Sequence, residues 1–296
     1  GRRTYGPRAR VRRGFRAFDH DDAVLTRAAR GCWLPSQRSV KIGQMARKCA
    51  FCHGEPVNQE HALPRWLARL FSDEIVDFER TLQLGDGEPE VRPWRGRPFS
   101  ATVGGPCVNC NSGWMSDLEA QTAPLLTPLI QNRDAQIDAV GQHLIATWAI
   151  KTMLMLRLIA ADDDDRELDD DIYGWIHRTR SPPPAEQIWI ASYAGEGQWP
   201  MSFHYFGAYI RRPGEADEFE PNAHCASFAV GHVAFGLTGH RLVNGPTAVP
   251  SLPPDALRPI WPAYGDTIDF PPPLALAGAG ELRTLATPGR WDGPIS

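Results

Sequence analysis

Apolar positions are densest between residues 140 and 161, where they surround nearly the whole circumference of a predicted helix. A helix of this kind is typical of the centre of a protein core. Lys151 and Arg157 interrupt the stretch, which favours a buried helix over a membrane span, because charges are rare in the apolar part of a bilayer. A shorter helix is expected at 172–178, and the Ser-Pro-Pro-Pro run at 181–184 then marks a break.

Beyond this break, aromatic and β-branched residues predict a sheet. They concentrate in the segments 187–194, 201–211 and 224–237, which loops rich in Gly, Pro and Glu separate. Four histidines of this region have no carboxylate or cysteine at ligand spacing, and we interpret them as structural. They are His204, His224, His232 and His240.

Shorter elements are expected in the first half of the chain. They are a strand at 57–61, a helix at 63–71 that Pro64 can begin, and strands at 75–84 and 90–103 around a Gly-Asp-Gly-Glu turn. A further helix is predicted from Asn111 through Glu119, and Pro124 and Pro128 are expected to interrupt the chain after it.

Four of the six cysteines form two Cys-x-x-Cys pairs that are separated by 54 residues. They are Cys49, Cys52, Cys107 and Cys110. Four thiolates from two such pairs suit a tetrahedral structural zinc site. This spacing indicates metal binding in a reducing compartment rather than a set of disulfide bonds. Cys32 and Cys225 remain outside the pairs, and we interpret them as inert.

Three polar residues near these cysteines suit phosphodiester hydrolysis. The imidazole of His61 can act as a general base near neutral pH. Glu60 and Asn111 offer oxygen ligands, which Mg²⁺ or Mn²⁺ prefers. Successive side chains on a strand point to opposite faces, so the strand must end or bulge here if Glu60 and His61 are to serve one site.

These motifs resemble the HNH, or ββα-metal, endonucleases that carry structural zinc on two Cys-x-x-Cys pairs. The resemblance covers roughly residues 45–125 and rests on Glu-His-Ala-Leu-Pro-Arg-Trp-Leu from Glu60 and Cys-Val-Asn-Cys-Asn-Ser-Gly-Trp-Met from Cys107. Uncharacterised bacterial and phage HNH proteins are similar over the same motifs. The resemblance implies that His61 is the general base and that Glu60 and Asn111 hold the catalytic divalent ion.

The chain departs from that family pattern at three points. Thr102 stands where the family usually has a middle Asn, the segment between the cysteine pairs is long, and Glu60 replaces the commoner Asp. Arg65 comes shortly after the expected base and is the candidate clamp for the scissile phosphate. Trp66 and Trp114 are expected to pack in a small core rather than to stack on a base.

Other polar residues have structural interpretations. His53 is expected to be exposed or to lie behind the four thiolates. Glu119 comes more than two helical turns after Asn111, so it is expected to make a structural hydrogen bond rather than bind the same metal. Eight of the ten residues at 162–171 are acidic, which is typical of a solvated loop.

Charge is distributed unevenly along the chain. Residues 1–48 carry 13 Lys/Arg and 3 Asp/Glu, a net charge of +10, and the remaining 18 and 32 give −14. Nucleic-acid binders usually show a basic footprint, so this acidic body does not itself support a nuclease. Residues 1–44 are expected to be weakly ordered, as a basic arm, a solvated leader, or sequence ahead of a true start at Met45. No signal peptide is expected, and a cytoplasmic location is predicted.

The sequence therefore predicts an α+β protein. A leader at 1–44 precedes a zinc-stapled ββα-metal domain at 45–130 and a helix-plus-antiparallel-sheet domain at 131–296. The expected function is a Mg²⁺- or Mn²⁺-dependent endonuclease acting on DNA. One alternative is a non-catalytic zinc-binding module for nucleic acid or protein, and another is an RNA-directed or toxin-like nuclease.

Overall fold

The computed structural model describes most of the chain between residues 48 and 292. The described ranges are 25–26, 48–54, 59–71, 76–82, 90–97, 99–100, 102–160, 170–195, 201–210, 222–242, 245–263 and 265–292. The predictions for the leader at 1–44 and the acidic run at 162–171 lie outside the described residues, apart from short parts in β1 (Leu25–Thr26) and at the start of α4 (Asp170–Thr179). None of the helices in these ranges combines the length and the apolar character that crossing a membrane requires.

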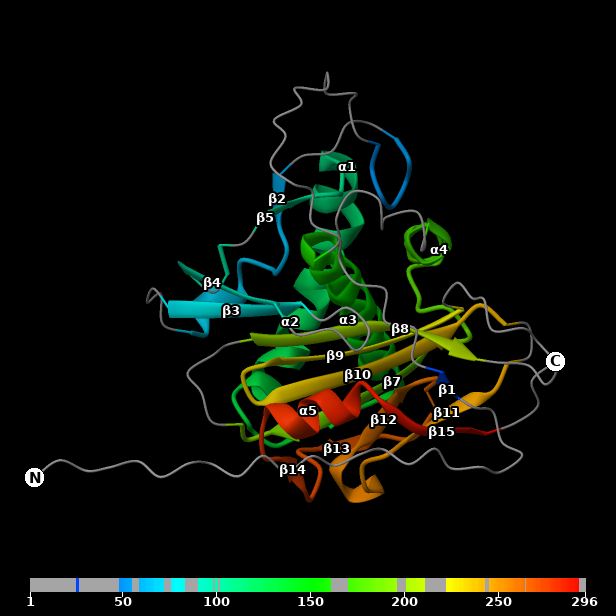
Figure 1. Ribbon diagram of the computed structural model, residues 1–296. Coiled ribbons are helices and arrows are strands. Elements are labelled where there is room, and N and C mark those ends of the chain that lie inside the picture. Colours follow the sequence, from blue (N-terminus) through cyan, green and yellow to red (C-terminus); the bar gives the residue numbers. More distant parts are fainter. Residues whose placement is uncertain are drawn as a thin grey trace, which may run out of the picture.

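A seven-stranded sheet, bent into a half-barrel, forms the centre of this α+β fold (Figure 1). Its order is β1-β8-β9-β10-β7-β12, with β14 also pairing with β7. The pairs are antiparallel except for the parallel pair β14–β7. The strands are β7 (Gln187–Tyr193), β8 (Met201–Ile210), β9 (Ala223–Val230), β10 (Val233–His240), β12 (Arg258–Trp261) and β14 (Ala275–Leu276).

The prediction of one strand segment at 224–237 is wrong in one respect, because the segment divides into β9 and β10. Gly231 makes the turn between them with a φ of 56°. A side chain at Gly231 would also press on the backbone oxygen of Ile130, at 2.7 Å from its Cβ. Only glycine combines this backbone conformation with so close an approach.

The helix α3 (Ala139–Ala160) packs against one face of the sheet, as its apolar circumference predicts (Figure 1). Trp148 is fully buried, and its ring lies 6.1 Å from Phe228 on β9 and 5.7 Å from Phe235 on β10. These two phenylalanines stack on each other at 4.7 Å. The aromatic contact fixes α3 across the middle of the sheet.

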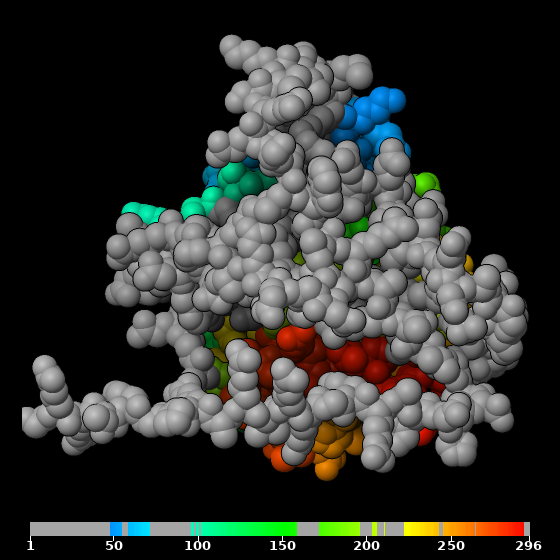
Figure 2. Space-filling model, viewed as in Figure 1, coloured from blue at the N-terminus to red at the C-terminus, as the bar shows by residue number. Residues whose placement is uncertain are grey.

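The helix α5 (Ala279–Leu285) covers part of the opposite face, so the sheet lies between helices (Figure 1). Leu282 and Leu285 are buried there, and the hydroxyl of Ser227 donates to the carbonyl of Leu282 at 2.6 Å. In the space-filling view, the surface of α5 and β15 (Pro288–Asp292) lies at the end of the molecule away from residues 48–54 (Figure 2).

Two strand pairs and a bent series of helices precede α3. β2 (Gln59–His61) pairs with β5 (Thr102–Gly104), and β3 (Val76–Leu82) pairs with β4 (Glu90–Gly96), both antiparallel. The helical segments are η1 (Leu67–Arg69), α1 (Val108–Cys110), the π-helical turn η2 (Asn111–Met115) and α2 (Ser116–Ile130). Smaller elements complete the fold: β6 (Ala135–Ile137) with β13 (Ile268–Phe270), β11 (Thr247–Pro250) with β15, and the short helix η4 (Pro254–Ala256).

Two helix predictions for this half are corrected. The segment 63–71 contains only the 3₁₀ turn η1, and its backbone hydrogen bonds join residues three apart, from Pro64 to Leu70. Pro124 and Pro128 do not interrupt α2. Pro124 is exposed, so water can satisfy the carbonyl that it leaves without a partner, while α2 buries its opposite side.

The strand prediction for 90–103 is also corrected, because β4 ends at Gly96 and β5 begins only at Thr102. A turn lies between them, in which the backbone N–H of Ser100 donates to the carbonyl of Arg97 at 3.1 Å. This turn lets β5 leave the hairpin and pair with β2 instead.

Replacing Trp148 with Ala should lower the free energy of unfolding by about 3–5 kcal/mol, because it leaves a cavity between α3 and the sheet. Urea denaturation followed by circular dichroism measures this change. Val140 on the same helix is 67% exposed, so Val140→Ala should change stability by less than about 0.5 kcal/mol. Equal effects of the two substitutions would contradict the proposed packing.

Candidate metal centre

The four paired cysteines come together in space, as their spacing predicts. The sulfurs of Cys49, Cys52, Cys107 and Cys110 all lie within 4.8 Å of one another. Cys52 Sγ and Cys107 Sγ are 3.7 Å apart. Tetrahedral zinc with Zn–S bonds of about 2.3 Å separates its sulfurs by about 3.8 Å. The donor set therefore fits a metal ion such as zinc.

The backbone folds the first pair into a tight turn. The N–H of His53 donates to the carbonyl of Cys49 at 2.9 Å, and His53 has a φ of 55°. At Gly54, a Cβ would lie 3.3 Å from the sulfur of Cys52, so this position favours glycine. The turn leaves the His53 side chain exposed, which is one of the two placements expected for it.

The second pair is held directly against the first. The backbone N–H of Cys107 donates to Cys49 Sγ at 3.3 Å, and the N–H of Ala50 donates to the carbonyl of Gly105 at 3.0 Å. Gly105 also lies against α3, where an added Cβ would collide with the side chain of Leu158. The second pair therefore contacts both the first pair and the central helix.

The protein environment favours charge on some of these sulfurs and opposes it on others. Burial raises the pKa of the Cys49 thiol, but backbone N–H groups, including those of Cys52 and Cys107, outweigh it and bring that pKa below its ordinary value. Burial raises the pKa of the Cys110 thiol strongly. A bound cation would supply the attraction that keeps all four sulfurs ionised.

The three residues expected to carry catalysis lie beside this cysteine cluster in the chain. Glu60 and His61 end β2, and both are half-buried. They occupy the last two positions of the strand and pair with Val103 and Thr102 of β5 in regular register, so a single site served by both stays a prediction. Asn111 comes directly after Cys110, is half-buried, and begins η2, with its N–H donating to the carbonyl of Cys107 at 3.0 Å. The strands β2 and β5 and the helix α1 lie at the same end of the molecule (Figure 1).

The register of β2 and β5 places Thr102 directly opposite His61. Thr102 is the position at which the resembled family usually has its middle Asn. Its exposed side chain has one hydroxyl, so it offers less hydrogen-bonding capacity than an amide. Arg65, the expected phosphate clamp, is exposed beyond the end of β2.

Aromatic side chains pack beside the cysteine cluster, and Trp114 is one of them, as the prediction that it packs in a small core requires. The ring of Phe51 lies 5.7 Å from Trp114 and 5.0 Å from Tyr173 of α4, in edge-to-face contacts. The guanidinium carbon of Arg180 lies 4.5 Å from the centre of the Trp114 ring. Trp66 is half-buried and packs against the same core. The contributions of Tyr173 and Arg180 have no local sequence signal, because both residues come from the other half of the chain.

The structural interpretation of Glu119 is confirmed. Its carboxylate accepts a hydrogen bond from the Lys151 ammonium at 2.7 Å, and the Lys151 side chain is only 2% exposed. This ion pair joins α2 to α3, and it explains how a lysine is tolerated inside an apolar helix.

One histidine of the sheet has a carboxylate partner that sequence spacing does not reveal. His224 Nε2 lies 3.2 Å from the Glu186 carboxylate, and both side chains are buried. Glu186 reaches across Gly239, where an added Cβ would collide with its carboxylate. The partner precedes β7 while His224 is on β9, so only the sheet order brings the pair together.

No family model matches the chain, and no curated protein and no solved structure matches it.

The purified protein should carry about one zinc ion per chain, measured by mass spectrometry of the metal, because four cysteines form one site. Cys110→Ser should lose that zinc and unfold at a lower temperature, as should the parent protein after treatment with a chelator. Cys225 is buried outside the cluster, so Cys225→Ala should keep its zinc. A parent protein that holds no metal would contradict the assignment.

Proposed function

We propose that this protein is a metal-dependent endonuclease of the HNH type. The observation that carries the proposal is the closure of the two cysteine pairs, which joins β5 and α1 to the segment that leads into β2. Two antiparallel strands and a helix around a four-cysteine cluster are what a zinc-stapled ββα-metal site requires. Along the chain, Glu60, His61 and Asn111 come in the order that the motif needs.

His61 is assigned the role of general base. Its imidazole can take a proton from the attacking water, and its position at the end of β2 leaves the side chain half-buried and within reach of solvent. Thr102 pairs with His61 from β5 and is assigned the role of orienting this end of β2. Arg65 is assigned to hold the substrate phosphate by charge.

Glu60 and Asn111 are assigned as ligands of a catalytic Mg²⁺ or Mn²⁺ ion. Their oxygens are the kind that such hard cations prefer. When bound, the ion would stabilise negative charge on the scissile phosphate and on the leaving oxygen. The cysteine cluster is assigned a separate, structural zinc ion, because four sulfur ligands leave no open position for a reactant.

A zinc-binding module without catalysis is the second candidate. Thr102 in place of the usual amide and the acidic body of the chain favour it. Such a module would bind nucleic acid or protein through the same frame, and Glu60 and His61 would then have no chemical role. DNA is the proposed substrate class, and RNA is the alternative within the catalytic proposal.

Purified protein should nick or linearise plasmid DNA in Mg²⁺ or Mn²⁺ and should not do so in EDTA. His61→Ala should lower the cleavage rate by about 10²-fold or more, because it removes the general base. His232 is exposed on the turn of the sheet, so His232→Ala should cleave at the parent rate. Undiminished cleavage by His61→Ala, with zinc still bound, would overturn the assignment. Binding of DNA without cleavage in any metal would favour the second candidate.

Glu60→Gln and Asn111→Ala should raise the Mn²⁺ concentration needed for half-maximal cleavage, because each weakens the site of the catalytic ion. Both variants should keep the structural zinc, which the cysteines hold. The measurement is a metal titration of the initial cleavage rate, run beside zinc analysis. An unchanged metal requirement in both variants would remove these two residues from the metal site.

A further inference from the structure

Arg180 links the carboxy-terminal half of the chain to the cysteine cluster. It comes directly after the last residue of α4 and places its guanidinium over the ring of Trp114 at 4.5 Å, a cation–π contact. Trp114 comes four residues after Cys110, and its ring lies 5.7 Å from Phe51, which stands between Cys49 and Cys52. The guanidinium of Arg180 is therefore held on a ring that packs against the first cysteine pair.

The charge of Arg180 depends on its surroundings. Burial lowers the pKa of Arg180, and the negative charge of Cys110 acts against this by raising it. Four thiolates around one zinc ion leave the cluster with an excess of negative charge. Burial of that excess is costly unless a cation lies close to it.

The backbone at Arg180 gives a second and independent observation. Its φ is 56°, in the left-handed region that ends many helices, and its N–H donates to the carbonyl of Ile176 at 3.0 Å. Glycine is the residue that usually occupies this position, because a side chain makes the conformation unfavourable. Arginine therefore occupies a position at which a helix end alone would favour glycine.

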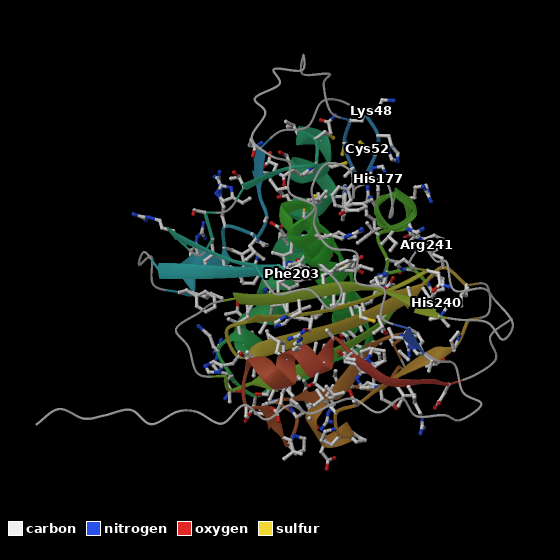
Figure 3. All side chains as sticks on the ribbon, in the orientation of Figure 1. Lys48, Cys52, His177, Phe203, His240 and Arg241 are labelled. Carbon is white, nitrogen blue, oxygen red and sulfur yellow. The ribbon has the colours of Figure 1, made fainter. Side chains whose placement is uncertain are left out.

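Two neighbouring basic residues belong to the same end of α4. The ring of His177 also packs against Trp114, 6.5 Å away in an edge-to-face contact, and it appears below Cys52 in the view of Figure 3. Burial lowers the pKa of His177, and three basic side chains lower it further. They are Arg180, Arg178 and His53. Arg178 is exposed and its guanidinium folds back over Gly174, where an added Cβ would be 2.9 Å from Nη1.

We propose that Arg180, held on the Trp114 ring at the end of α4, is a positioning residue that supplies the counter-charge of the zinc–cysteine cluster. The inference rests on the structural zinc of the proposed function and does not depend on whether the protein cleaves nucleic acid. It makes α4 part of the metal centre, although no cysteine lies on this helix. Groups that surround the ligands of a metal site commonly change its affinity by about 10–100-fold.

The test measures how fast zinc passes from the full-length protein to an excess of a chromophoric chelator, with no nucleic acid present. Arg180→Gln should release zinc about 10-fold faster than the parent, because the counter-charge is lost. Arg180→Lys keeps the charge and should fall between the two. Arg178→Gln removes the same charge from the same end of α4 without touching Trp114, so it should release zinc at the parent rate.

Arg180→Gly separates the counter-charge from a capping role. Glycine relieves the left-handed backbone, so the metal-free variant should unfold at or above the temperature of the metal-free parent. The zinc-loaded variant should nevertheless release its metal as fast as Arg180→Gln. A merely structural role would move thermal stability and zinc release in the same direction.

Three results would overturn the inference. They are parent-like zinc release by Arg180→Gln, equal acceleration by Arg178→Gln, and a parent protein that holds no zinc. If the Arg180 variants release zinc at the expected rates but the protein cleaves no nucleic acid, the inference on Arg180 stands and the nuclease proposal fails. If the protein cleaves DNA but the Arg180 variants release zinc at the parent rate, the nuclease proposal stands and the inference on Arg180 fails.

Discussion

The burial of α3 is the constraint on which the described fold depends. Its apolar circumference can be removed from water only if other elements surround it, and the sheet, α2 and β5 do so. Trp148 fixes its position across β9 and β10, and the Lys151–Glu119 ion pair fixes its position against α2. Because one buried helix contacts both halves of the chain, the position of the cysteine cluster relative to the sheet depends on the packing of α3.

The cysteine cluster closes a long segment of the chain by bringing its two ends together. The two pairs are separated by 54 residues, and bringing the ends of such a segment together costs conformational entropy. The hydrogen bond from Cys107 to the sulfur of Cys49 and the contact of Gly105 with Leu158 hold the second pair in place. A metal ion bound by all four sulfurs would complete this closure, because binding free energy then becomes folding free energy.

Sequence patterns predict the parts of this fold whose signal is local. The apolar circumference of 140–161, the aromatic and β-branched runs from 187 on, and the paired cysteines each carry their own evidence. The turn at Gly231 also has a local signal, because a glycine and one polar residue separate two apolar runs there, and the prediction of a single strand missed it. The continuity of α2 through Pro124 has no local signal, because it depends on which side of the helix faces water. The candidate site shows the same limit more sharply. The spacing of its cysteines predicts their meeting, whereas the pairing of Glu186 with His224 depends on the order of strands in the sheet, and the contact of Arg180 with Trp114 depends on how α4 packs.

The arrangement around Phe51 bears on how the chain is divided. A boundary between 130 and 131 stays a prediction, but three contacts cross it at the metal centre: Tyr173 on Phe51, Arg180 on Trp114 and Leu158 on Gly105. Each of these partners comes from α3, from α4 or from the residue directly after α4. A chain cut at this boundary would keep all four cysteines and lose every one of these supports. The four cysteines therefore belong to the first half of the chain, while much of their surroundings belongs to the second, and the candidate metal centre depends on both.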